Sequence, residues 1–136
     1  MLKKLFPLLL GSAFCLATQA VTPEILMNQA IRDGKASAIL TGPVADNMRR
    51  ITHSTAETQA KIERMSIEPD NCHFYKFTVT QPQVPARSGA IIGDYVTVSK
   101  TKVCPDDREQ SPPEVIGCMI GGQSCMPVKG ATSVKP

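Results

Sequence analysis

The sequence lacks tryptophan and holds only two tyrosines and four phenylalanines among its 136 residues. A core built mainly from Ile, Val, Leu and Met is thin, and covalent cross-links would help to stabilise it. The formal net charge is only +3. Basic residues are scattered singly, apart from Lys3-Lys4 and Arg49-Arg50, so the sequence lacks the clustered positive charge that phosphate backbones require. We therefore expect no nucleic-acid partner.

Catalytic motifs are also lacking. Only His53 and His73 could act as general bases near neutral pH. His53 precedes Ser54 in a polar segment near Asp46 and Glu57. However, catalytic triads are recognised by geometry and not by adjacency, and the chain has no Gly-x-Ser-x-Gly motif. The sequence predicts a protein that is not an enzyme and that uses no cofactor.

Three segments contain possible metal ligands. His73 follows Cys72, but no Cys-x-x-Cys spacing accompanies them, which argues against zinc. The acidic cluster at residues 106–109 lacks the alternating oxygen ligands and the glycine of a calcium loop. Cys118-Met119 and Cys125-Met126 offer soft ligands suited to Cu(I). Pairing the two cysteines would remove both thiolates, so copper binding is kept as an alternative only.

The first 20 residues have the pattern of a cleaved signal peptide. Lys3 and Lys4 precede an apolar run from Leu5 to Leu16, and Ala20 provides a small residue at the cleavage position. The run is shorter than the roughly 20 residues of a membrane span. A lipid anchor on Cys15 is the competing interpretation, but the bulky Phe14 before it fits that pattern poorly. We expect a periplasmic or secreted product that begins near Val21 and is not stably inserted in the membrane.

Four cysteines remain after this cleavage: Cys72, Cys104, Cys118 and Cys125. An even number of cysteines in an oxidising compartment predicts disulfides. Of the three possible connectivities, spacing favours Cys72 with Cys104 and Cys118 with Cys125. A Gly121-Gly122 turn would place Cys118 directly across a hairpin from Cys125, at a distance suitable for bonding.

Periodicity predicts a small α+β domain with two short helices that cover a mostly antiparallel sheet of three to four strands. The expected helices are residues 23–33 and a segment that starts at Pro43. A first strand is expected at Ala36–Thr41, and the strongest strand signals are Lys61–Glu68, Cys72–Thr80 and Tyr95–Cys104. The expected loops are Thr52–Gln59 and the long connection Gln81–Gly89. The expected organisation is a signal peptide (1–20), a core (21–104), a proline-rich and charged linker (105–113), a disulfide-closed hairpin (114–128) and a flexible tail (129–136).

The two long strands of this core carry conflicting pairing signals. Matching their apolar faces pairs an odd-numbered residue with an even-numbered one, such as Phe77 with Val98. A directly opposed pair of Cys72 and Cys104 instead matches even with even. The sequence therefore predicts a β-bulge or a diagonal disulfide, with the irregularity near residues 100–102.

A small exported domain without catalytic motifs predicts a non-enzymatic protein of the bacterial envelope. We expect an interaction or assembly accessory of a secretion or conjugation system, with another envelope protein as its partner. Arg49 and Arg50 are the candidate partner surface. The alternative is a periplasmic carrier of a small ligand or of copper.

Cleavage after Ala20 gives the first testable prediction. Thr18 and Ala20 place small side chains at the third and first positions before the scissile bond. The intact mass of the exported protein should therefore correspond to a chain that starts at or near Val21. A mass that shows a start upstream of Thr18 would contradict the prediction of a soluble periplasmic product.

Overall fold

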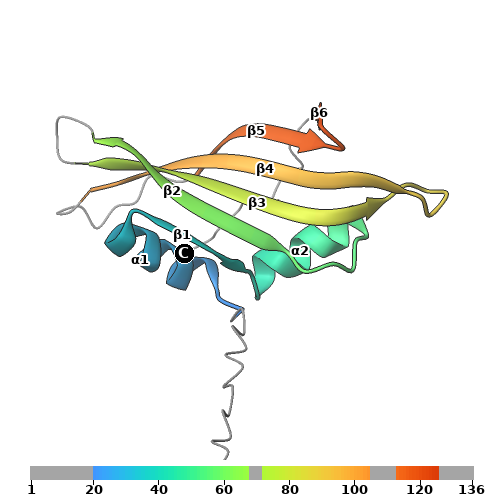
Figure 1. Cartoon of the computed structure of the whole chain (residues 1–136), viewed down its shortest axis with the longest axis horizontal. Helices are drawn as coiled ribbons and strands as arrows, with labels where there is room; N and C mark the ends of the chain where they lie inside the picture. Colours follow the sequence, from blue (N-terminus) through green and yellow to red (C-terminus); the bar gives the residue numbers. More distant parts are fainter. Residues whose placement is uncertain (1–19, 68–71, 105–112, 126–136) are drawn as a thin grey trace, which may run out of the picture.

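The computed structural model describes residues 20–67, 72–104 and 113–125. Its helices and strands follow in the order α1 (Pro23–Asp33), β1 (Lys35–Ile39), α2 (Pro43–Thr52), β2 (Gln59–Ile67), β3 (His73–Pro85), β4 (Ile91–Val103), β5 (Glu114–Ile120) and β6 (Gln123–Ser124). The strands form one antiparallel sheet in sequential order (Figure 1). The predicted signal peptide up to Gln19, residues 105–112 of the predicted linker, and the predicted tail lie outside the described residues.

The α+β class is confirmed, but the sheet has six strands instead of three or four. The expected loop Gln81–Gly89 is mostly strand, because β3 runs on to Pro85 and a tight turn leads into β4. In that turn the Ala86 amide donates to the Ala90 carbonyl at 2.7 Å. Pairing of β3 with β4 shifts register beyond Gln81, where Gln83 has φ +56°. This bulge allows the pairing to continue through a segment that is rich in proline.

Both helices follow from local signals. Pro23 stands in the first turn of α1, and Gly34 ends the helix with φ +83°, its amide bonded to the Ala30 carbonyl. The bounds of α1 agree with the prediction. In α2, Pro43 stands in the first turn and His53 terminates the helix in the left-handed conformation. Figure 1 shows the two helices on the same side of the sheet.

The hydrophobic core lies between the helices and this side of the sheet. Alternate residues of the central strands point into it, as strand geometry requires. The fully buried apolar side chains from the helices, the α1–α2 region and the strands include Leu26, Leu40, Met48, Ile62, Tyr75 and Val79. The core contains few aromatic side chains, as the composition indicates.

The β3–β4 pairing decides which residues of β4 face the core. Its register is uninterrupted from His73 opposite Val103 to Gln81 opposite Tyr95. The predicted irregularity near residues 100–102 is therefore wrong. The conflict is resolved differently: β4 turns Thr97 and Ser99 into the core and leaves Val96 and Val98 on the opposite face.

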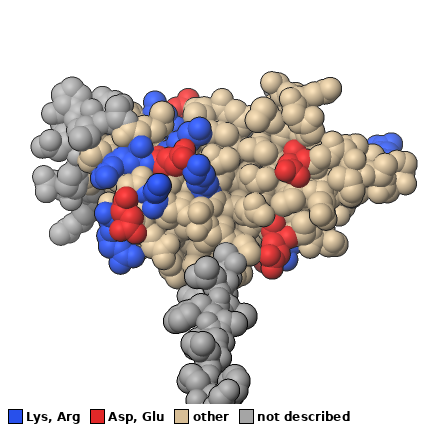
Figure 2. Space-filling model, in the orientation of Figure 1, with Lys and Arg blue, Asp and Glu red and all other residues tan. Residues whose placement is uncertain are grey.

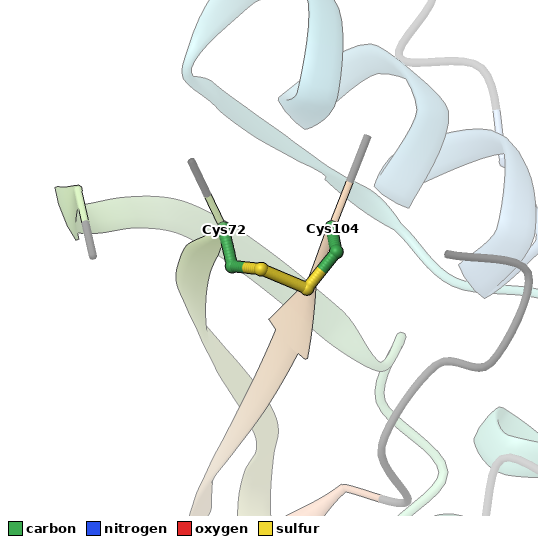
Figure 3. The surroundings of a disulfide bond; sticks show 2 residues. All are labelled: Cys72 and Cys104. Carbon is green, nitrogen blue, oxygen red and sulfur yellow. A yellow bond between two sulfur atoms is a disulfide. The ribbon is translucent and has the colours of Figure 1, made fainter. Parts of the chain in front are cut away.

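Both predicted disulfides are present. Cys72 and Cys104 join the start of β3 to the residue after β4 across 4.2 Å between Cα atoms (Figure 3). Cys118 and Cys125 are 5.2 Å apart at Cα, across a hairpin that pairs Ile120 with Gln123 as expected. The hairpin is not separate from the sheet, because β5 pairs with β4 and Cys118 joins the core cluster.

No helix in the described part of the chain is both long enough and apolar enough to cross a membrane. Two disulfides are compatible with a periplasmic or extracellular location, where they persist.

The Cys72–Cys104 bridge should contribute more to stability than Cys118–Cys125. It spans a sequence separation of 32 residues against 7, for which the chain-entropy model gives about 3.7 and about 2.5 kcal/mol at 25 °C. We expect Cys72→Ala with Cys104→Ala to lower the free energy of unfolding more than the matched pair Cys118→Ala with Cys125→Ala. Urea unfolding measures both. An equal or reversed order would contradict this ranking.

Candidate functional site: the outer face of the sheet

The outer face is the side of the sheet turned away from the helices. Register aligns its side chains in rows that run across the strands. The charged row consists of Lys35, Glu63, Lys76, Lys100 and Glu114. The next two rows consist of Ser37, Lys61, Thr78, Val98 and Gly117, and of Ile39, Gln59, Thr80, Val96 and Met119. Phe74 and Lys102 face each other beyond the charged row.

Two lysines of the charged row, Lys76 and Lys100, are directly opposed on β3 and β4. Like charges in this arrangement are destabilising, because their Cβ atoms lie only about 4.5–5.5 Å apart. The Phe74 ring offsets part of this cost. The Lys100 Nζ lies 4.0 Å from the ring centroid and the Lys102 Nζ lies 5.8 Å from it, both within the range of a cation–π interaction.

Glu63 is the carboxylate in the middle of these lysines. Lys61 Nζ lies 2.7 Å from its Oε1. The pKa of Glu63 is lowered from its ordinary value, first by the hydrogen bond from Lys61 and then by the charge of Lys61, with smaller contributions from Lys76 and Lys35. Glu63 is therefore ionised at neutral pH and neutralises part of the lysine charge.

Beyond the charged row, and apart from Lys61 and Lys102, the other side chains in the described rows of the outer face are uncharged. Thr78, Thr80, Val96 and Val98 are half-buried, and the side chain of Met119 is 44% exposed. Figure 2 shows the same division: Lys and Arg gather towards the end of the molecule where β3 begins and β4 ends, and the other end carries few charges. The outer face thus has a basic end and a neutral end.

The residues predicted as a partner surface lie elsewhere. Arg49 and Arg50 are in the last turn of α2, on the helix side of the sheet. Arg49 is half-buried, whereas Arg50 is exposed and donates a hydrogen bond to the Asn47 side chain. The structure therefore does not bring this pair together with the lysines of the outer face.

Ser54, which follows the exposed His53, belongs to a buried polar network. Ser54 is 3% exposed, and its hydroxyl donates to the Pro82 carbonyl. Gln81, fully buried, donates to the Ala56 carbonyl at 2.7 Å and accepts from the Thr58 hydroxyl. These bonds attach the loop after α2 to β3, so the Ser54 hydroxyl has a structural role.

The predicted metal-ligand candidates are not assembled into a site in the described residues. Cys72 beside His73 is bonded to Cys104, and Cys118 beside Met119 is bonded to Cys125. The residues that the structure describes contain no group of three or more His, Cys, Asp or Glu side chains that could hold a metal ion.

Sequence reasoning missed the basic end of the outer face. Its lysines come from four strands and are isolated in the sequence, at positions 35, 61, 76, 100 and 102. The available signal was parity: Lys100 and Lys102 have the same parity as Val96 and Val98, and these residues share one side of β4. Only the pairing with β3 places Lys76 beside them.

No protein-family model, curated protein or solved structure matches this chain.

The opposed lysines should show an unfavourable coupling. In a double-mutant cycle with Lys76→Thr and Lys100→Thr, the coupling between the two charges should destabilise the wild type by roughly 0.2–1 kcal/mol. Added salt should reduce it by screening. Urea unfolding of the wild type, the two single variants and the double variant at low and high NaCl measures this coupling free energy. A coupling of zero or of favourable sign would contradict the register of these two strands.

Proposed function

We propose that this protein is an exported, non-enzymatic interaction or assembly subunit of a bacterial envelope system, such as a secretion or conjugation apparatus. It binds another protein of the envelope through the outer face of its sheet. The observation that carries the proposal is the two-part surface of that face, with lysines at one end and Val96, Val98 and Met119 towards the other.

The distribution of covering elements supports this role. Both helices pack on the inner face, and among the described residues no helix or strand lies over the outer face. An antiparallel sheet that faces water on one side ordinarily alternates apolar and polar residues. Here β4 reverses that rule, because Thr97 and Ser99 are buried while Val96 and Val98 point outward. Outward-facing valines gain from burial against a partner.

Charge identifies the kind of partner. Five lysines and two glutamates occupy the charged row, the next row (Lys61) and the Phe74–Lys102 pair, which gives this face a net positive charge. Electrostatic complementarity favours a partner with an acidic surface, and it acts mainly on the rate and specificity of association. The partner is accordingly an acidic protein of the envelope.

The alternative role in copper binding has less support. Cys118 and Cys125 are bonded to each other, which leaves the Met119 thioether as the soft ligand in the described part of that hairpin. A single thioether is a weak basis for a copper site.

Site-specific photo-crosslinking in cells tests the proposed function. A photoreactive residue at Thr78 or Thr80, on the outer face, should give a crosslink to one envelope protein. The same residue at Asn28, an exposed position of α1 on the opposite side, is the matched control and should not capture that protein. Capture from Asn28 with equal yield, or no crosslink from either outer-face position, would overturn the proposal.

A further inference from the structure

We infer that the partner contributes an extended segment that lies along β3 and β4 on the outer face, with acidic residues at one end and apolar residues at the other. This inference rests on the proposed function and specifies the chemistry of the partner. The occupant is a single protein segment, and its charged end is placed over Lys76, Lys100 and Lys102.

The order of residues along β4 sets the pattern of the segment. Lys102, Lys100, Val98 and Val96 follow one another on the outer face. Same-face residues of a strand are about 6.6–6.8 Å apart, which is also the spacing of alternate residues in an extended peptide. A segment with acids at two alternate positions and valines at the next two alternate positions therefore matches this side of β4 residue by residue.

The basic end is organised before a partner arrives. Phe74 holds the ammonium groups of Lys100 and Lys102 on one side of the sheet, and the side chains of Lys76, Lys100 and Lys102 are half-buried. Side chains that are already ordered lose less rotamer freedom on binding. An incoming carboxylate also relieves the repulsion between Lys76 and Lys100, so the unfavourable pair in the free protein becomes favourable in the complex.

The charges of these rows favour a protein segment, and not an anionic bilayer, as the occupant of the outer face. Glu63 and Glu114 interrupt the lysines of the charged row. A bilayer presents a continuous layer of negative charge, which would repel both carboxylates. A peptide can place one acid over the Lys76–Lys100 pair and the next over Lys102, and leave the two glutamates beside uncharged residues.

Peptide binding to the purified oxidised protein tests the inference. The probe is a blocked, fluorescent peptide, Glu-Ser-Glu-Ser-Val-Ser-Val-Ser, used with its reversed sequence because either strand direction satisfies the spacing. Two control peptides replace both Glu by Gln, or separate the two Glu so that they no longer alternate. Fluorescence anisotropy should show binding of the probe in one direction, and clearly weaker binding of both controls.

Variants locate the site. Lys76→Thr with Lys100→Thr should weaken binding by about three- to thirtyfold, because two exposed ion pairs with the peptide are lost. Glu63→Gln adds one net positive charge and should strengthen binding about twofold. Arg87→Gln, at the exposed tip of the β3–β4 hairpin, removes one positive charge away from the site and should leave binding unchanged. Circular dichroism and urea unfolding confirm that each variant is folded.

The outcomes separate this inference from the proposed function. Equal binding of all peptides, or binding that Arg87→Gln weakens as much as the lysine variants, would overturn the inference. Lysine-dependent binding to phosphatidylglycerol vesicles without peptide binding would also overturn it, in favour of a membrane surface. In either case a crosslink at Thr78 that is absent at Asn28 would leave the proposed protein partner intact.

Discussion

The antiparallel ladder between β3 and β4 is the constraint on which the rest of the structure depends. The Cys72–Cys104 bridge closes one end, and the register then continues without a shift to Gln81 opposite Tyr95. Every opposed pair in this stretch matches odd with odd or even with even. Because side chains alternate along a strand, the bridge and the ladder together decide which half of β4 faces the core and which half faces outward.

This register has an unfavourable consequence in the core. Among the residues that the structure describes, the buried hydroxyl of Thr97 has no hydrogen-bond partner, and the Ser99 hydroxyl reaches the Phe77 carbonyl only at 3.5 Å. A buried polar group without a partner costs about 1–3 kcal/mol, and leaving a valine half-buried forgoes part of the roughly 1.5–3 kcal/mol of full burial. Positions where a sequence departs from the pattern that best stabilises its fold are expected at functional surfaces, which is consistent with an outer face selected for binding.

The elements that depend on local chemistry could be predicted from the sequence. Gly34 and Pro23 mark the ends of α1, and Gly121-Gly122 sets the hairpin that aligns Cys118 with Cys125. The orientation of β4 could not be predicted in this way, because its alternation fits either face and only its partner strand decides between them. The same limit concealed the candidate site, since lysines that are isolated in sequence become neighbours only through pairing. The pairing of β5 with β4 could not be predicted either, because the proline-rich segment before β5 is typical of a domain boundary.

Charge is distributed unevenly over the protein as a result of this pairing. From Val21 onward the chain has 13 basic and 12 acidic side chains, a formal balance of +1. The outer face alone holds five lysines and two glutamates, a balance of +3, so the remaining residues together carry −2. This −2 belongs to residues outside the described ranges, because the other described residues balance at zero, with five arginines and five carboxylates. A nearly neutral protein can therefore have a directional preference, because the net positive charge of its described surface lies on the outer face. The overall net charge, which contributed to the expectation of no nucleic-acid partner, does not show where positive charge gathers: the register of the strands, and not the composition, places the five lysines on one face.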